Sequence, residues 1–323
     1  MKKSLIALAV LAASGAAMAQ SSVTLYGVMD LSLVKSNGIS AQLSGSGLMN
    51  NGNSRIGLRG VEDLGGGLKA SFNLEQGINP ESGALTGGAA GAWNRAAFLE
   101  LSGGFGGVRL GRSLTPSYYG LAAWELTGAA NYSAVANQFG FVAAGARNDS
   151  QIAYTTPNFG GVTASLAVVL KPDTPAAVGD NAKYDLNVIY ANGPIAAALS
   201  YNKVQEHKGN LAIGGSYDLG VAKVAASFQD GYAGGVAPSN TTAQKQRGFT
   251  IGATVPVGAF SVTLDIARDT KAKDTDVVIE GKYALSKRTF AYAAYYNDGK
   301  QDGAAVYKTG AKNHLGLGIR HNF

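Results

Sequence analysis

The chain ends on His314-Leu-Gly-Leu-Gly-Ile-Arg-His-Asn-Phe323, in which apolar or aromatic residues alternate with small or polar ones. This period of two predicts a β-strand with one face in an apolar medium and the other in water. The alternation continues to Phe323 itself, whereas the last residues of soluble domains are commonly frayed. We therefore expect the C-terminal residue to be part of a sheet.

The same alternation recurs along the whole chain, for example over residues 23–34, 184–190, 249–255 and 260–266. Tight connections rich in Gly, Asn, Asp and Pro, the residues that hairpin turns require, alternate with long polar connections. This arrangement places all short turns on one rim, which a β-sandwich would not do. It predicts an all-β fold, a closed transmembrane antiparallel barrel of about 16 strands. Closure is needed because an open sheet edge in lipid leaves backbone groups unpaired.

The composition agrees with a single all-β domain. The chain has 45 glycines, 15 tyrosines and 11 phenylalanines, and only 15% of its residues are charged, against ~25% in typical soluble domains. After residue 19 no apolar run is long enough for a membrane-spanning helix. There are no cysteines, so stability must come from burial and sheet closure. The net charge of +6 is spread too evenly to indicate a nucleic-acid partner.

The N-terminus is predicted to be a cleaved signal peptide spanning residues 1–19. Met1-Lys2-Lys3 is followed by a short apolar run and by Ala17-Met18-Ala19, a small-x-small cleavage site. The apolar run is well short of the roughly 20 residues that span a membrane. We expect cleavage before Gln20, export of the chain, and one barrel domain over residues 20–323.

Several sequence blocks resemble those of the Gram-negative general porins, in particular the β-proteobacterial branch. These blocks are residues 22–30, 60–66, 105–112 and 148–154, together with Phe323. The resemblance implies a homotrimer of sixteen-stranded barrels in the outer membrane, in contact with lipid and lipopolysaccharide. It also implies an infolded third loop, and recognition of Phe323 by the barrel-assembly machinery. The implied function is passive diffusion of small hydrophilic solutes and ions through a water-filled channel, without a cofactor.

The selectivity of such a channel depends on its diameter and on the charges that line it. Residues 114–146 form the candidate constriction loop, because a loop of this length in a compact domain is usually functional or disordered. Its many aromatic residues and alanines argue against disorder. Its one charged residue is Glu125. The alternative is an external loop that contacts a partner.

Basic residues are expected to line the wall of the pore. Some lie on the polar side of their strands, at positions that alternate with apolar residues, namely Arg55, Arg59, Lys69 and Arg320. Arg95 and Arg109 flank a tight turn. Arg112 lies where a strand meets the long loop, and the alternation does not predict which way its side chain points.

In the family that the chain resembles, a ladder of basic wall residues faces acids on the infolded loop. The candidates here are Arg55, Arg59, Arg95 and Arg112 for the ladder and Glu125 for the loop acid. Because bases exceed acids near the loop, we expect a weak to moderate anion preference. The alternative is that some of these arginines pair with nearby carboxylates or with lipid headgroups.

No catalytic or metal site is predicted. The three histidines are far apart in the sequence, and no Ser/His/Asp or paired-carboxylate cluster indicates a barrel hydrolase. The acids Asp269, Asp274 and Asp276 lack the glycine of an EF-hand loop and are interpreted as a solvated loop. A substrate-selective channel remains an alternative within the transport class.

Overall fold

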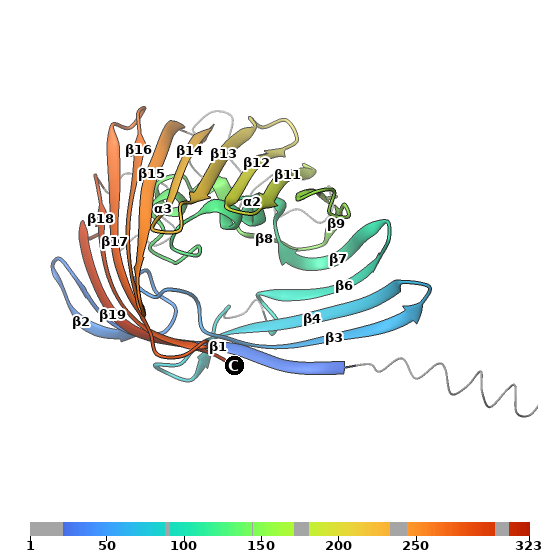
Figure 1. Ribbon diagram of the computed structural model, residues 1–323, viewed down its shortest axis with the longest axis horizontal. Coiled ribbons are helices and arrows are strands. Elements are labelled where there is room, and N and C mark those ends of the chain that lie inside the picture. Colours follow the sequence, from blue (N-terminus) through green and yellow to red (C-terminus); the bar gives the residue numbers. More distant parts are fainter. Residues whose placement is uncertain (1–21, 88–90, 144, 171–180, 233–243, 301–309) are drawn as a thin grey trace, which may run out of the picture.

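The computed structural model describes residues 22–87, 91–143, 145–170, 181–232, 244–300 and 310–323. The predicted signal peptide lies outside the described residues. Within them, one antiparallel sheet curves round on itself and encloses a lumen (Figure 1). No helix in the described part of the chain is long and apolar enough to cross a membrane.

The sheet contains nineteen strands, and sixteen of them make the barrel wall. The other three, β2, β5 and β8, are short additions within long connections, so the predicted strand number is confirmed. In chain order the strands are β1 (Ser22–Ser36), β2 (Ile39–Ser44), β3 (Arg55–Gly65), β4 (Leu68–Asn79), β5 (Ala84–Leu85), β6 (Ala96–Gly103), β7 (Gly106–Leu114), β8 (Arg147–Asn148), β9 (Gln151–Thr155), β10 (Val162–Val169), β11 (Lys183–Asn192), β12 (Ile195–Val204), β13 (Asn210–Asp218), β14 (Lys223–Tyr232), β15 (Lys245–Val257), β16 (Phe260–Asp269), β17 (Asp274–Ala284), β18 (Thr289–Asp298) and β19 (Asn313–Asn322).

The first and last strands close the barrel. The second half of β1 pairs with β19 from Val28 opposite Asn322 to Ser36 opposite His314, and its first half pairs with β3. Beyond β19, the backbone N–H of Phe323 donates to the carbonyl oxygen of Gly27 at 3.1 Å, and the N–H of Gly27 donates back at 3.0 Å. The expectation that the sheet includes the C-terminal residue is therefore confirmed, and this pairing closes the predicted barrel.

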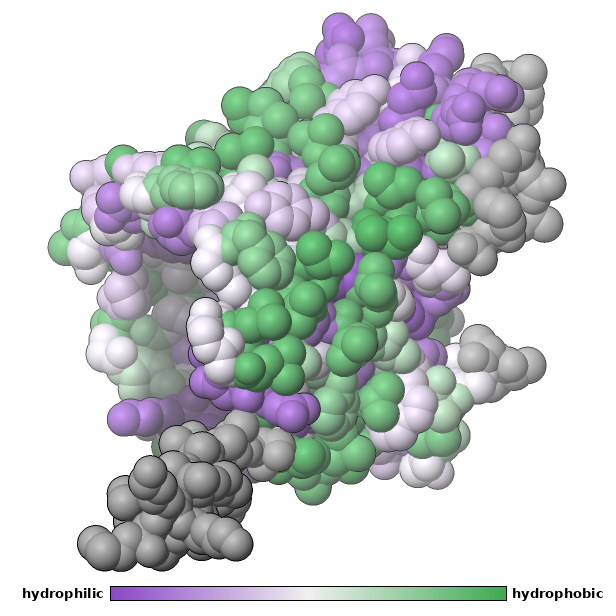
Figure 2. All heavy atoms as spheres, turned by 90° about the vertical axis from the view of Figure 1, so that its right-hand side faces the viewer, coloured by the Kyte–Doolittle hydropathy of each residue, from purple (hydrophilic) through white to green (hydrophobic). Residues whose placement is uncertain are grey.

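Side chains alternate between an apolar exterior and a polar interior. Leu315, Leu317 and Ile319 on β19 are exposed on the outside, whereas polar side chains such as Gln229 and Glu280 are buried on the inside. Figure 2 shows hydrophobic side chains spread over the middle of one exterior face, with hydrophilic ones above them. This is the pattern of a barrel whose outer surface contacts lipid.

The predicted difference between the two rims is also present. Short turns join β3 to β4, β11 to β12 and β15 to β16, among others. In the β3–β4 turn, Gly65, Gly66 and Gly67 all have positive φ angles, which residues with a Cβ rarely adopt. The long connections lie at the opposite rim. In bacterial outer-membrane barrels the short turns face the periplasm and the long loops face outward.

The long third loop folds into the barrel, as predicted. It carries α2 (Pro116–Trp124), α3 (Ala134–Gln138) and the 3-10 helix η2 (Gly140–Ala143), which lie inside the ring of strands (Figure 1). Thr115 caps α2 by accepting a hydrogen bond from the N–H of Tyr118 at 3.1 Å. The helices pack against β11, β12, β16 and β17, and Tyr132, Phe139 and Phe141 are fully buried there. Burial of these aromatic rings holds the loop against one wall.

Candidate pore constriction

Polar contacts with the wall anchor the third loop near its start and at its middle. The carboxylate of Asp185 on β11 accepts hydrogen bonds from the N–H and the hydroxyl of Ser117, at 2.9 and 2.7 Å. In the middle of the loop, the buried hydroxyl of Tyr132 donates to Glu280 on β17. Burial and the Glu280 carboxylate raise the pKa of Tyr132 well above its usual value, so the hydroxyl keeps its proton.

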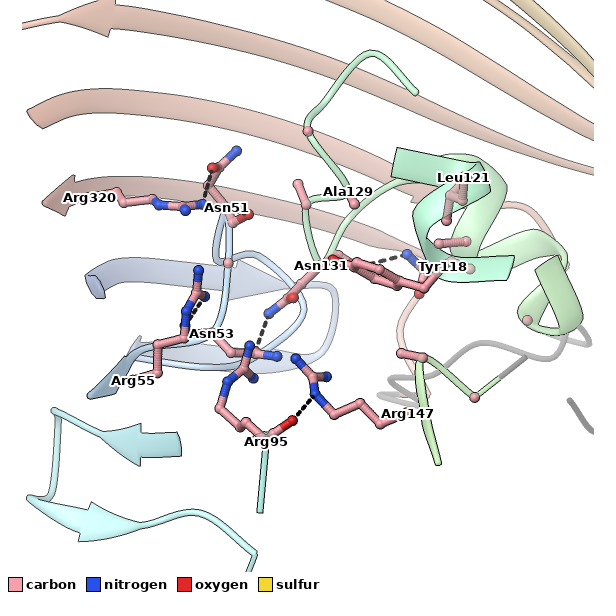
Figure 3. Close-up of a pocket in the computed structure, with 18 residues that line it drawn as sticks. Asn51, Asn53, Arg55, Arg95, Tyr118, Leu121, Ala129, Asn131, Arg147 and Arg320 are labelled. Carbon is pink, nitrogen blue, oxygen red and sulfur yellow. Dashed lines mark hydrogen bonds between the residues drawn. The ribbon is translucent and has the colours of Figure 1, made fainter. Parts of the chain in front are cut away.

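The connection between β2 and β3 also folds inward. Met49 is 0% exposed and packs over Gly316 of β19, where a side chain would collide with it. The amide of Asn131 in the third loop donates to the side-chain oxygen of Asn53 and to the carbonyl of Gly47, both at 2.8 Å. Asn51 donates to the hydroxyl oxygen of Tyr132 at 2.9 Å. The first and third loops therefore meet within the lumen (Figure 3).

Arginine side chains converge on the space that these loops leave open (Figure 3). A cavity of about 300 Å³ is lined by Arg55, Arg95, Arg147 and Arg320, by Tyr118 and by several amide and small side chains. A second cavity of about 300 Å³ shares Arg95 and Arg147 with the first and adds Arg112. Five guanidinium groups from β3, β7, β8, β19 and the segment before β6 thus surround one region of the pore.

Few carboxylates offset this charge in the described part of the chain. Glu75 on β4 lies between two of the arginines, 2.7 Å from Arg95 and 3.2 Å from Arg55. Asp149, on the connection between β8 and β9, pairs with Arg112. Arg320 donates to the side-chain oxygen of Asn51 at 2.9 Å, and it lies near enough to the buried carboxylate of Asp30 for their charges to attract. Among the described residues, five arginines against these three carboxylates leave a net positive charge around the constriction.

The predicted loop acid does not face the arginines. Glu125 is only 4% exposed, and its carboxylate accepts hydrogen bonds from within its own loop. The donors are the hydroxyls of Thr127 and Ser133, at 2.6 and 2.8 Å, and the N–H of Ala129, at 2.6 Å. Glu125 therefore stabilises the fold of the loop. In place of the expected loop acid, amide side chains and Glu75 face the arginines of the wall.

Three other predicted wall residues lie apart from this cluster. Arg59 stacks over the Tyr26 ring at 5.1 Å, and Lys69 is exposed close to the β3–β4 turn. Arg109 pairs with Glu100 at 2.6 Å and donates to the hydroxyl of Tyr119 on α2 at 3.2 Å. The alternative that some arginines pair with local carboxylates therefore applies to Arg109, and in part to the residues around Glu75. Of the predicted residues, the structure brings together Arg55, Arg95, Arg112 and Arg320.

Some residues of the constriction are not predicted from the sequence. Arg147 lies just outside the predicted constriction loop over residues 114–146 and directly precedes the block at residues 148–154. Its position beside that block is the one signal that could identify it. Asn51, Asn53 and Asn131 lie in loops with no period-two pattern, and nothing in the sequence marks them as facing the pore.

The acids near the rim of β16 and β17 differ from expectation. The sequence predicts a solvated loop for Asp269, Asp274 and Asp276, but all three are buried. They lie on the inward parity of their strands, and Asp269 accepts hydrogen bonds from the N–H groups of Lys271 and Ala272. Among the described residues, no group of three or more acids, histidines or cysteines could hold a metal ion.

Comparison with known proteins places this geometry in context. The model of a family described as Gram-negative porin matches residues 5–303. The chain is 39% identical over 318 residues to outer membrane porin protein 32 of Delftia acidovorans, covering 90% of the chain and 88% of that relative. It is 30% identical to an outer membrane porin protein of Bordetella pertussis over the full length of both. Among solved structures, the anion-selective porin from Comamonas acidovorans matches with a TM-score of 0.73 and 29% identity, over 94% of this chain and all of that one.

Proposed function

Because the chain belongs to the Gram-negative porin family, and is therefore a passive diffusion channel of the outer membrane, we propose that its pore prefers small anions over cations. The observation that carries the proposal is the convergence of five arginines on the space between the first and third loops. The described carboxylates near them, Glu75, Asp149 and the buried Asp30, offset only part of that charge.

The magnitude of the effect follows from Coulomb's law. One unit charge about 6 Å from a permeating ion contributes about 0.7 kcal/mol even at the dielectric constant of water, a factor of about three in ion concentration. Salt screens charges more than about 10 Å apart at 0.1 M, but a narrow pore with low-dielectric walls focuses the field of near ones. Several unpaired arginines are therefore sufficient to exclude cations partially. The anion selectivity named for the Comamonas porin supports the same conclusion.

The test is the reversal potential of single channels in planar bilayers under a salt gradient. An anion-preferring pore shifts the potential toward the equilibrium potential of chloride. A shift toward that of potassium overturns the proposal. Liposome swelling with sugars of increasing size then separates a general pore, whose rates fall smoothly with size, from a channel with one anomalously fast solute.

We also propose that the channel works as a homotrimer in contact with outer-membrane lipid and lipopolysaccharide. The membership in the family and the apolar exterior support this assembly. Cross-linking of the detergent-extracted protein followed by mass measurement should give three copies. A monomer under conditions that keep the barrel folded would contradict it.

Two further proposals concern maturation. We propose that residues 1–19 are removed as a signal peptide and that the mature protein is one barrel domain over residues 20–323. N-terminal sequencing of the mature protein should then give Gln20 as the first residue. Phe323 is proposed to be read by the barrel-assembly machinery. Its ring packs against Gly27 and remains 41% exposed, so part of it is available for contact. Substitution of Phe323 by Ala should reduce the assembled barrel in cells more than it reduces refolding of the purified protein in detergent.

A further inference from the structure

Two arginines of the constriction are directed by successive backbone carbonyl groups. Nε of Arg112 donates to the carbonyl oxygen of Asn94 at 2.5 Å, and Nε of Arg147 donates to that of Arg95 at 2.7 Å. Backbone carbonyls are neutral, so they fix the direction of the two guanidinium groups without cancelling their charge. The positions of both arginines therefore depend on how the backbone of residues 93–95 is held.

This backbone segment has a conformation that other parts of the fold must support. Trp93 has a φ angle of 64°, in the left-handed region that bulky residues rarely adopt. A residue in this region persists only where the surrounding structure fixes it, and such residues cluster at functional sites. Contacts with neighbouring elements are therefore needed to hold the chain in this course directly before β6.

Gln76 on β4 supplies the contact to Trp93. Its side-chain oxygen accepts a hydrogen bond from the N–H of Trp93 at 2.5 Å. Its amide nitrogen donates to the carbonyl oxygens of Thr86 and Gly77, at 2.9 and 2.8 Å. Because one partner is a donor and the other two are acceptors, the orientation of the amide is fixed. The side chain is only 4% exposed, so its loss leaves the N–H of Trp93 without its acceptor.

The residues next to Gln76 hold the rest of the segment. The N–H of Gly77 donates to the side-chain oxygen of Asn94 at 3.0 Å, and the amide of Asn94 donates to the hydroxyl of Thr86 at 3.0 Å. The backbone N–H of Arg95 donates to the carbonyl oxygen of Glu75 at 3.0 Å. Both residues whose carbonyls direct the arginines are thus bound to β4.

We propose that Gln76 is a positioning residue for the pore: through its hydrogen bond with Trp93 it holds the two carbonyl groups that direct a pair of arginines into the constriction. This inference rests on the proposed function for the effect of the arginines on selectivity. Gln76 is not among the described residues that line the two cavities at the constriction, and its side chain carries no charge. It therefore acts on a permeating ion through the residues that it holds.

The test is the substitution Gln76→Met, which keeps the length of the side chain and changes no charge but removes its hydrogen bonds. The reversal potential of single channels is measured in a gradient of potassium chloride. The matched control is Gln229→Met on β14, the same change at a glutamine that is 0% exposed and donates to Ser227 at 2.6 Å. Heat-modified mobility in gels confirms that each barrel is folded.

We expect Gln76→Met to lower the ratio of anion to cation permeability about two- to fourfold, and the control to leave it unchanged. Moving one guanidinium charge from about 6 to about 10 Å from the ion path lowers this ratio about twofold when the charge is screened by 0.1 M salt. Two arginines lose their fixed direction. Arg112 keeps Asp149 as a partner, so the larger part of the change comes from Arg147.

A channel without the two arginines separates positioning from a general effect on structure. In the background Arg112→Gln with Arg147→Gln, the further change Gln76→Met should leave the permeability ratio as it is, because the charges that it would displace are gone. A purely structural role of Gln76 would change the ratio equally in both backgrounds.

Two outcomes overturn the proposal: an unchanged ratio in folded Gln76→Met, or a change of full size in the background without the arginines. If Gln76→Met does not fold, Asn94→Leu removes the neighbouring contact with β4 and should lower the ratio in the same way. An unchanged ratio in that variant also overturns the proposal. Failure of the proposed function is a separate result, because a wild type that prefers cations should prefer them still more after Gln76→Met.

Discussion

Nε of Arg147 donates to the backbone carbonyl oxygen of Arg95 at 2.7 Å, so two arginines far apart in the sequence are fixed side by side in the pore wall. Arg95 has Glu75 as an ionic partner, whereas the carbonyl that orients Arg147 is neutral. The contact thus positions the Arg147 guanidinium without cancelling its charge. This arrangement makes Arg147 the most informative residue for testing the selectivity of the channel.

Substitution of Arg147 by Gln should reduce the anion preference. Loss of one unit charge about 6 Å from the ion path, screened by 0.1 M salt, changes the concentrations of anion and cation about twofold each in opposite directions, so it lowers the ratio of anion to cation permeability by about fourfold. Arg147→Lys retains the charge and should keep most of the ratio. The measurement is the reversal potential in a potassium chloride gradient, and an unchanged value in Arg147→Gln argues against a role of this residue in the pore field.

Substitution of Glu75 by Gln should have the opposite effect. Glu75 is the carboxylate between Arg55 and Arg95, so its removal leaves both guanidinium charges without their ionic partner. The hydroxyl of Tyr26 also donates to Glu75, at 3.0 Å, and can donate to the amide oxygen of Gln instead. We expect an increase of about fourfold in the permeability ratio, the same size as for one screened unit charge elsewhere in the pore wall. A decrease would mean that Glu75 contributes more by holding the two arginines in position than by neutralising their charge.

Substitution of Glu125 by Ala should leave selectivity unchanged and lower stability. The change leaves the hydroxyls of Thr127 and Ser133 and the N–H of Ala129 without their acceptor in a buried place. We expect a loss of about 1–3 kcal/mol in the free energy of unfolding, visible as a lower thermal midpoint in circular dichroism. If Glu125→Ala instead raises the anion preference as much as Glu75→Gln does, the carboxylate acts on the pore and its inferred structural role is wrong.

Substitution of Gly316 by Val should widen the pore. A Cβ at this position would lie 2.8 Å from the Cβ of Met49 and 2.9 Å from its carbonyl oxygen, so the inward segment of the first loop has to move. That movement would break the hydrogen bond between Asn53 and Asn131, and we expect a higher single-channel conductance. Gly281→Val on β17 is the control, because no described atom lies within 4 Å of its added Cβ. Equal conductance in the wild type and Gly316→Val would show that the segment does not limit the pore.

The barrel could be predicted from the sequence because its determinants are local. Period-two alternation fixes which side of each strand faces lipid, and turn composition fixes which rim is short. The same parity placed Arg55 and Arg320 in the lumen, where the structure has them.

Loop residues could not be placed in this way, because parity applies only to strands. The inward course of the first loop depends on Met49 fitting over a glycine of β19, a contact between residues 267 positions apart in the chain. The direction of Glu125 depends on donors within its own loop, and the position of Arg147 depends on a backbone carbonyl of Arg95. Such contacts exist only in the folded barrel, so the loop sequence alone does not show which way the carboxylate of Glu125 points.

We propose that the excess of arginines over carboxylates at the constriction makes this channel prefer anions. The most direct test is the zero-current potential of the wild-type channel in a planar bilayer with a tenfold gradient of potassium chloride. We expect the potential to have the sign of the chloride equilibrium potential, with chloride more permeable than potassium. A potential of the opposite sign, or one no different from that of free diffusion, would contradict the account.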